Sequence, residues 1–257
     1  MKSFTAIALE NFPLVKAGDD IAKTIVDVAS KNGLRLEEGD VIVVAQKIFS
    51  KAEGRVIKLG EVTPSKKAKE LAEVIGKSPE FVEIVLRETK RIVKASHEIL
   101  LVEDRRGLIS INAGIDKSNV QGRDNFAFLP ENPDESAENC RSRIRELTGR
   151  SVGVIVCDTY SRPFRRAQVN FAIGFAGIAP FRDYRGKRDL FGQVLRVKNI
   201  AVVDELAASA ELLMGQGREA RPVVIFRGLA DDVAEDQNAG MKQLYMSREE
   251  DLFKGAL

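Results

Sequence analysis

VGVIVCDTYSRPFRR, residues Val152 to Arg166, carries the strongest signal in this sequence. The apolar run Val152 to Cys157 predicts a buried strand, which is expected to end at Asp158. The Asp158 carboxylate and the Thr159 hydroxyl are oxygen ligands of the kind that Mg²⁺ and Mn²⁺ prefer, and the arginines that follow match phosphate oxygens. The stretch predicts a metal ion bound to a phosphorylated ligand. The alternative is a strand followed by a solvated turn.

A second segment has the same character. Leu108 to Ile111 predicts a short strand that breaks at Asn112-Ala113-Gly114 and leads to Asp116 and Asn119. Two predicted strands thus each end on an aspartate in a polar loop, and ligands often gather at such strand ends. The two aspartates could share one or two divalent cations and neutralise phosphate charge. The alternative for Asp116 is a turn residue that binds its own backbone.

Two further segments could contact a nucleotide. The predicted strand Asp40 to Ala45 runs into Gln46, Lys47 and Lys51, a basic strand end that could hold phosphates; the alternative is a set of solvated surface lysines. A predicted helix from Ala201 to Met214 ends at Gly215-Gln216-Gly217. Glycines let a backbone approach a ligand closely, although a simple helix stop is the alternative. Neither the P-loop motif GxxxxGK[ST] nor the dinucleotide-binding motif GxGxxG follows any predicted strand, so neither of these nucleotide-binding folds is supported.

Composition excludes several classes of protein. The 257 residues contain 40 Lys and Arg against 38 Asp and Glu, a net charge of +2 that is too balanced for a dedicated nucleic-acid or membrane-surface protein. No apolar span is long enough to cross a bilayer, so we expect a cytoplasmic protein without nucleic-acid or membrane partners. Cys140 and Cys157 are expected to be free thiols. With one histidine, His97, and two cysteines, the chain has too few soft ligands for a zinc cluster.

Helical and strand-like segments interleave without strict alternation, which favours an α+β fold with mixed or antiparallel sheets and packed helices. The predicted strands are Thr5–Leu9, Asp40–Ala45, Glu98–Val102, Leu108–Ile111, Val152–Cys157, Phe171–Gly177, Val194–Val197 and Val223–Arg227. The predicted helices are Asp19–Asn32, Ser65–Ile75, Phe81–Lys94, Asp134–Leu147 and Ala201–Met214, with Asn125–Pro133 as a loop and Gln243–Phe253 closing the chain.

Several motifs together resemble one family. They are ENFPLV, VVAQKIFSKAEGR, INAGIDKSN, GVIVCDTYSRPFRR with NFAIGFAGI, RDLFGQ, DELAASAELLMGQG and VVIFRGL, in matching order from about residue 6 to 228. They resemble the coenzyme F420-0:L-glutamate ligase family. The resemblance implies a single ligase domain over residues 1–257, built from intertwined, segment-swapped halves, that forms a homodimer. It also implies that the C-terminal flavin-binding domain of some relatives is absent.

The resemblance further implies a reaction. The family adds L-glutamate through amide bonds to the lactyl-phosphate tail of coenzyme F420-0, with GTP hydrolysis, Mg²⁺ or Mn²⁺ (two ions per subunit in the fullest case) and K⁺. Asp116, Asp158 and Thr159 match the family's metal ligands, and Gln216 stands where some members place a glutamate ligand. The implied catalytic groups are Asp116, Asp158, Lys51 and Arg166. The implied GTP contacts are Phe12, Pro13, Leu14, Val15, Gln46, Lys47, Lys51, Asn119, Met214, Gly215, Gln216 and Gly217.

Two other functions remain open at this point. A metal-dependent phosphohydrolase could use the same aspartates to split a nucleotide without ligating anything. A non-catalytic protein could bind GTP and form no product.

Overall fold

A computed structural model describes residues 3–96, 98–233, 240–247 and 249–251. His97 and the end of the predicted closing segment, Leu252 and Phe253, lie outside the described residues. The chain divides into two compact units whose segments interleave along the sequence. Unit 1 comprises residues 1–14, 19–46 and 133–244, and unit 2 comprises residues 15–18, 47–132 and 245–257. The mixture of sheets and helices confirms the expected α+β class.

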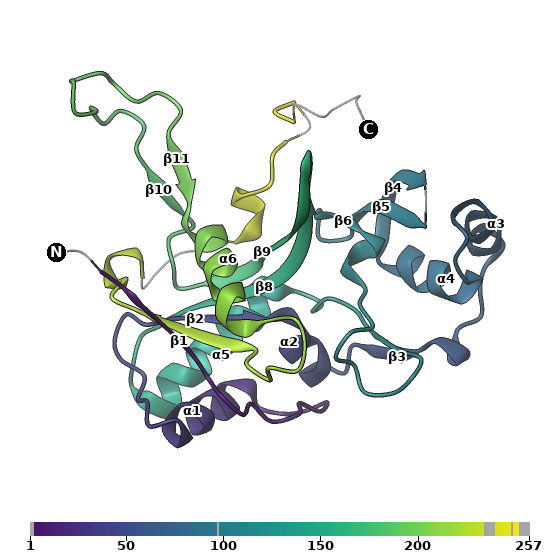
Figure 1. The fold of residues 1–257 in the computed structure, drawn as a ribbon, viewed down its shortest axis with the longest axis horizontal. Helices are drawn as coiled ribbons and strands as arrows, with labels where there is room; N and C mark the ends of the chain where they lie inside the picture. Colours follow the sequence, from purple (N-terminus) through teal and green to yellow (C-terminus); the bar gives the residue numbers. More distant parts are fainter. Residues whose placement is uncertain (1–2, 97, 234–239, 248, 252–257) are drawn as a thin grey trace. The chain divides into compact units, whose positions relative to one another are not determined.

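Unit 1 is built on a five-stranded sheet with the strand order β1-β12-β2-β8-β9. Strands β2 and β8 pair in parallel and the other neighbours are antiparallel. Helix α6 lies on one face of this sheet, and α5 with α1 lies on the other (Figure 1). The strands are β1 (Thr5–Ala8), β2 (Val41–Ala45), β8 (Gly153–Arg162), β9 (Arg165–Ala176) and β12 (Val223–Arg227); the helices are α1 (Ile21–Lys31), α5 (Pro133–Thr148) and α6 (Val202–Met214).

Local sequence signals explain these elements. Strand β2 reads VIVVA, an unbroken apolar run, because helices cover both faces of the sheet and bury Val41 to Val44 completely. Helix α1 begins after Asp20, whose side chain accepts a hydrogen bond from the Lys23 N–H. Helix α6 ends at Gly215, whose positive φ of 68° suits glycine. The predicted glycine stop of this helix is therefore confirmed.

Unit 2 packs helices on a three-stranded antiparallel sheet, β4-β5-β6, beside a two-stranded β3-β7 sheet. Its strands are β3 (Val56–Lys58), β4 (Thr89–Ser96), β5 (Ile99–Asp104), β6 (Ile109–Ile111) and β7 (Asn125–Ala127); its helices are α2 (Gln46–Ala52, which starts on the last residue of unit 1), α3 (Lys66–Ile75) and α4 (Pro79–Glu88). Ser65 and Ser78 cap α3 and α4, because their side chains accept hydrogen bonds from the Ala68 and Phe81 N–H groups. The core includes Val82, Val85, Leu100 and Val102.

Three element predictions are wrong. The helix expected over Phe81–Lys94 ends at Glu88, and Thr89–Ser96 forms β4, because Ile92 and its neighbours pair with β5. Asn125–Ala127, expected in a loop, pairs with β3. Val194–Val197 forms no strand; only an isolated bridge joins Val194 to Arg188. In the first two cases, pairing to another strand overrides local preference. In the third, Val194–Val197 finds no ladder to join, so its apolar residues do not form a strand.

The most consequential correction concerns β8. The strand does not end at Asp158 but continues to Arg162 as half of a hairpin with β9. Asp158 lies opposite Phe171, and Thr159 lies opposite Asn170. The residues expected in a polar loop are therefore held by a strand, which fixes their side-chain directions more tightly than a loop would.

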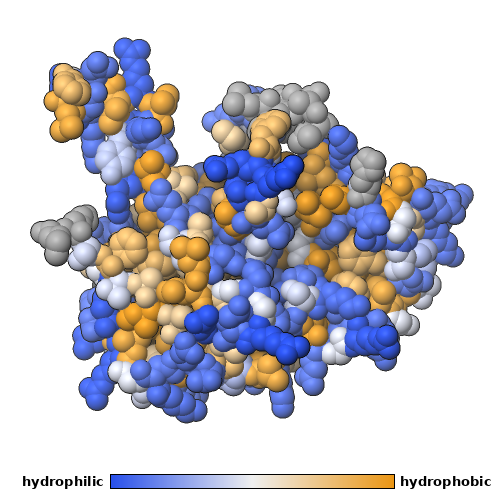
Figure 2. Space-filling model, in the orientation of Figure 1, coloured by the Kyte–Doolittle hydropathy of each residue, from blue (hydrophilic) through white to orange (hydrophobic). Residues whose placement is uncertain are grey.

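A long arm projects from unit 1 between β10 (Phe181–Asp183) and β11 (Asn199–Ala201), visible in Figure 1. Figure 2 shows apolar side chains on this arm among charged ones. Leu190, Phe191 and Val197 are 99%, 89% and 87% exposed. Among the described residues, the helices are all too short or too polar to span a lipid bilayer.

Candidate functional site

The first cluster of predicted site residues lies in unit 2, between α2 and the loop after β6. Lys47 and Lys51 lie one helical turn apart on α2 and reach the same loop. The Lys47 Nζ lies 2.5 Å from Asp116 Oδ2 and 2.5 Å from the Ser118 hydroxyl. The Lys51 Nζ donates to the Asn119 carbonyl at 2.6 Å. Four predicted residues, Asp116, Asn119, Lys47 and Lys51, are thus brought together.

The electrostatics of this cluster favour an ionised Asp116. Burial raises the pKa of the Asp116 carboxyl, but the hydrogen bond and charge of Lys47, with the Ser118 N–H and hydroxyl, outweigh burial and hold the pKa below its usual value. Burial, and then the neighbouring charge of Lys47, lower the pKa of Lys51. Two ammonium groups held close together attract an anion, as a phosphate site requires.

The loop that carries Asp116 has an unusual backbone, and its residues suit it. Asn112 and Asn119 have positive φ angles of 52°, a region that asparagine tolerates. Gly114 has a φ of 69°, and an added Cβ would lie 2.8 Å from the Leu129 side chain. The Asn112 side chain accepts a hydrogen bond from the Leu100 N–H at 3.1 Å. The predicted break after the strand is therefore confirmed, and it aims Asp116 at α2.

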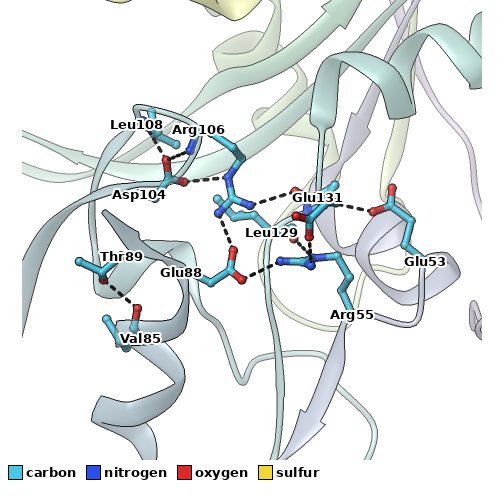
Figure 3. A network of polar contacts seen from close by, with 11 residues as sticks. Glu53, Arg55, Val85, Glu88, Thr89, Asp104, Arg106, Leu108, Leu129 and Glu131 are labelled. Carbon is cyan, nitrogen blue, oxygen red and sulfur yellow. Dashed lines mark hydrogen bonds and ion pairs between the residues drawn. The ribbon is translucent and has the colours of Figure 1, made fainter. Parts of the chain in front are cut away.

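A buried ionic network holds the segment that follows α2 (Figure 3). Glu88 lies between two guanidinium groups, 3.0 Å from Arg55 and 3.1 Å from Arg106. Arg55 also donates to the Leu129 carbonyl and pairs with Glu131. Arg106 pairs with the fully buried Asp104 at 2.8 Å. The network connects the segment after α2 to β5, α4 and residues 129–131.

The second cluster lies in unit 1 and joins β8, β9 and the end of α6. The Thr159 hydroxyl donates to Asn170 Oδ1 at 2.9 Å, and the Gln216 Nε2 donates to the Thr159 Oγ1 at 3.0 Å. The same Nε2 donates to Glu211 Oε1 at 2.6 Å. Asn170 is 3% exposed and its Nδ2 donates to the Cys157 Sγ at 3.4 Å. The predicted residues Thr159 and Gln216 are thus in direct contact.

Burial, and then the charges of Asp158 and Glu211, raise the pKa of the Cys157 thiol, so Cys157 stays protonated. The charges of the Asp158 and Glu211 carboxylates therefore both reach the buried Cys157 sulfur. Cys140 and Cys157 are both free and buried, as expected.

The other predicted nucleotide contacts of unit 1 lie near the end of α6. The Phe12 N–H donates to the Ala220 carbonyl at 3.2 Å, which places the 12–14 segment beside the turn that follows Gly217. Leu14 is 82% exposed, whereas Phe12, Met214 and Gln46 are buried. Pro13 lies in the same segment, and Val15 belongs to unit 2. The Glu219 carboxylate accepts from the Gly217 N–H at 2.7 Å, and a Cβ on Gly215 would strike Glu219.

The arginines of the β8–β9 hairpin lie at its exposed end. Arg162 pairs with Arg165 in register, and an Arg162 nitrogen donates to the Arg166 carbonyl at 3.4 Å. Arg165 and Arg166 are exposed. Three guanidinium groups within five residues leave this hairpin strongly positive.

The predicted metal ligands fall into both units, Asp116 in unit 2 and Asp158, Thr159 and Gln216 in unit 1. Within the described residues, no three His, Cys, Asp or Glu side chains gather as a metal cluster. The unit 1 ligands nevertheless fit a hard cation, because they are oxygens and because Glu211 Oε2 is buried without a hydrogen-bond partner among the described residues. A shallow cavity of about 510 Å³ near α3, α4 and β4 is lined by none of the predicted residues.

Sequence reasoning missed three polar residues of unit 1: Asn170, Glu211 and Glu219. Asn170 is the polar position in an otherwise apolar part of β9, and Glu211 is the acid in the last, apolar turn of α6. Both are polar residues in buried patterns, a signal that the sequence does contain.

Comparison with known proteins gives one consistent family. The family profile described as F420-0:gamma-glutamyl ligase matches residues 10–228. A protein of Methanothermobacter thermautotrophicus named coenzyme F420:L-glutamate ligase is 45% identical over 250 residues, 97% of this chain and 98% of that protein. Proteins of the same name from Archaeoglobus fulgidus and Methanocaldococcus jannaschii are 45% and 41% identical, each over 96% of its length. The chain covers 97% and 96% of its own length in these two alignments.

Proposed function

This chain belongs to the F420-0:gamma-glutamyl ligase family, and we propose that it joins L-glutamate to the lactyl-phosphate side chain of coenzyme F420-0, and further glutamate to the product, at the expense of GTP. The observation that carries the proposal is the near full-length similarity to relatives with that name. The paired lysines of α2, held against the loop of Asp116, support the phosphate chemistry.

The reaction needs an activated carboxylate, because an oxide ion is too poor a leaving group for an amine to displace. A carboxylate oxygen of F420-0 attacks the γ-phosphorus of GTP, the bond from phosphorus to the β-γ bridging oxygen breaks, and GDP leaves with an acyl phosphate formed. The glutamate amine then attacks the acyl carbon, phosphate departs with the carbonyl–oxygen bonding pair, and the amine loses a proton to solvent or phosphate. The protein's tasks are positioning and charge neutralisation.

The residues take roles that follow from their chemistry. Lys47 and Lys51 would bind phosphate oxygens, and Arg166 with its neighbours would bind the phosphodiester or carboxylate of the coenzyme. Asp116, Asp158, Thr159 and Gln216 would hold the Mg²⁺ or Mn²⁺ ions, with K⁺ as a further cation. Bound divalent cations neutralise phosphate charge as it develops. The segments 12–15 and 214–217, with Gln46 and Asn119, would contact the nucleotide.

Mass spectrometry tests the proposed reaction. Purified protein with F420-0, L-glutamate, GTP and Mn²⁺ should yield products heavier by one or more glutamyl units, and the yield should depend on GTP. GTP turnover that is indifferent to F420-0 would favour the phosphohydrolase. Tight GTP binding without any product would favour a non-catalytic nucleotide-binding protein.

Lys51→Ala should weaken GTP binding by about 1.5–3 kcal/mol, the range for a hydrogen bond to a charged group. Lys66→Ala and Lys67→Ala provide the matched controls, since both lysines are exposed on α3 and should leave the affinity unchanged. Isothermal titration with a non-hydrolysable GTP analogue measures all three. Equal affinities of the three variants for the GTP analogue would mean that Lys51 is a solvated surface lysine and does not contact phosphate.

We also propose a homodimer in which a second copy covers part of the arm between β10 and β11. Large exposed apolar side chains such as Leu190 and Phe191 mark association surfaces. Light scattering should give twice the chain mass for the wild type. Leu190→Glu with Phe191→Glu should shift the mass toward the monomer, and an unchanged dimer would exclude the arm as the contact.

A further inference from the structure

One carboxylate oxygen of Glu211 is buried without a hydrogen-bond donor among the described residues. Glu211 lies in the last turn of α6, and Gln216 donates to its Oε1 at 2.6 Å. Its Oε2 is buried, and within the described part of the chain no donor contacts it. A buried carboxylate oxygen without a donor is costly unless something else satisfies it, such as a cation.

The direction of the hydrogen bonds in this cluster can be followed atom by atom. Asn170 donates through Nδ2 to the Cys157 sulfur, so its oxygen faces Thr159. The Thr159 hydroxyl donates its one proton to that oxygen, so the lone pairs of Thr159 Oγ1 can only accept. Asn170 therefore fixes Thr159 as an acceptor, the form in which a hydroxyl can ligate a cation.

The Gln216 amide nitrogen lies between two such acceptors. It is 3.0 Å from Thr159 Oγ1 and 2.6 Å from Glu211 Oε1. A half-turn of the amide would place Gln216 Oε1 against the Glu211 carboxylate, where like partial charges repel unless a cation lies between them. The Thr159 and Glu211 oxygens around Nε2 can therefore be satisfied either by an N–H donor, as here, or by a cation.

We propose that Glu211 supplies the carboxylate of a divalent-cation site whose other protein ligands are Thr159 Oγ1 and Gln216 Oε1. The proposal rests on the metal dependence put forward above and adds a ligand to it. Thr159 and Gln216 are neutral, and affinity for a hard divalent cation depends on ligand charge. Glu211 provides the negative charge that an amide at position 216 lacks, from a position one helical turn before the glycine stop.

Manganese binding, measured without turnover, tests this assignment. Mn²⁺ is titrated into the full chain in the presence of a non-hydrolysable GTP analogue, and the free Mn²⁺ is measured by electron paramagnetic resonance. Glu211→Gln should lose one bound ion or bind it about 10–100-fold more weakly. Glu205→Gln is the matched control, an exposed acid on the same helix, and should bind Mn²⁺ as the wild type does. Moving the charge, with Glu211→Gln and Gln216→Glu together, should restore binding.

A second measurement does not depend on how well Glu211→Gln folds. Gln216→Glu in the otherwise unchanged chain places two carboxylates together, so its melting temperature should fall without Mn²⁺ and recover when Mn²⁺ is added. Equal Mn²⁺ binding by wild type and Glu211→Gln, or no rescue by the double variant, would overturn the role of Glu211 alone. A wild type that binds no Mn²⁺ would overturn the proposed metal dependence with it.

Discussion

Asp158→Asn should reduce kcat by about 10³-fold or more while the protein remains folded, because removal of one charged group that stabilises phosphoryl transfer costs about that much. Asparagine keeps the size of the side chain, and β8 is held by β2 and β9 on either side, so the strand should form unchanged. Product formation is followed by mass spectrometry, and folding by circular dichroism. A rise in KM for GTP with unchanged kcat would contradict a role in the chemical step.

Asp27→Asn is the control for this variant, since Asp27 is an exposed acid on α1 that pairs only with Lys23 among the interactions described. Its kcat should match the wild type. Mn²⁺ titration of both variants separates loss of a ligand from loss of a positioning contact. Unchanged activity and unchanged metal dependence in Asp158→Asn would remove Asp158 from the site.

Asp104→Ala should destabilise unit 2 by about 3–5 kcal/mol, the cost of leaving one member of a buried ion pair without its partner. Asp104 is fully buried and accepts hydrogen bonds from the Arg106 and Leu108 N–H groups as well as from the Arg106 side chain. Burial opposes the charge on Arg106, but Asp104 and then Glu88 raise the pKa of Arg106. Without Asp104, Arg106 keeps a buried charge and only one carboxylate.

Urea denaturation followed by circular dichroism measures this loss, since the chain has no tryptophan to report by fluorescence. Glu70→Ala is the control: Glu70 is exposed and lies 3.8 Å from Lys66, a surface pair worth about 0–1 kcal/mol. A loss below about 1 kcal/mol for Asp104→Ala would mean that water or neighbouring groups compensate for the network. The network would then not be what secures the end of α2.

Much of the fold is visible in local sequence. The apolar runs of β2 and β12 and the glycine after α6 each act within a few residues, so the pattern alone predicts them. Asp104 also acts locally, since its side chain accepts hydrogen bonds from the backbone of the turn between β5 and β6. The roles that the resemblance assigns to the site residues remain predictions.

The extent of the strands was not visible in the same way. The segment from Asp158 to Arg162 is polar and reads as a loop, yet it forms the second half of β8 because β9 offers it a partner. Thr89–Ser96 continues a helical pattern in sequence and becomes β4 for the same reason. A ladder hydrogen bond depends on the residue opposite, which a local pattern does not contain.

The sequence by itself determined the α+β class, the main apolar strands, the helix ends and the polar residues that were candidates for chemistry. The tertiary structure alone decided which of them meet: Lys47 with Asp116, Thr159 with Asn170, and Gln216 with Thr159 and Glu211. Propensity and capping act between near neighbours in the chain. Hydrogen bonds and ion pairs of this kind join residues 5 to 69 positions apart, and their geometry exists only once the sheets have closed.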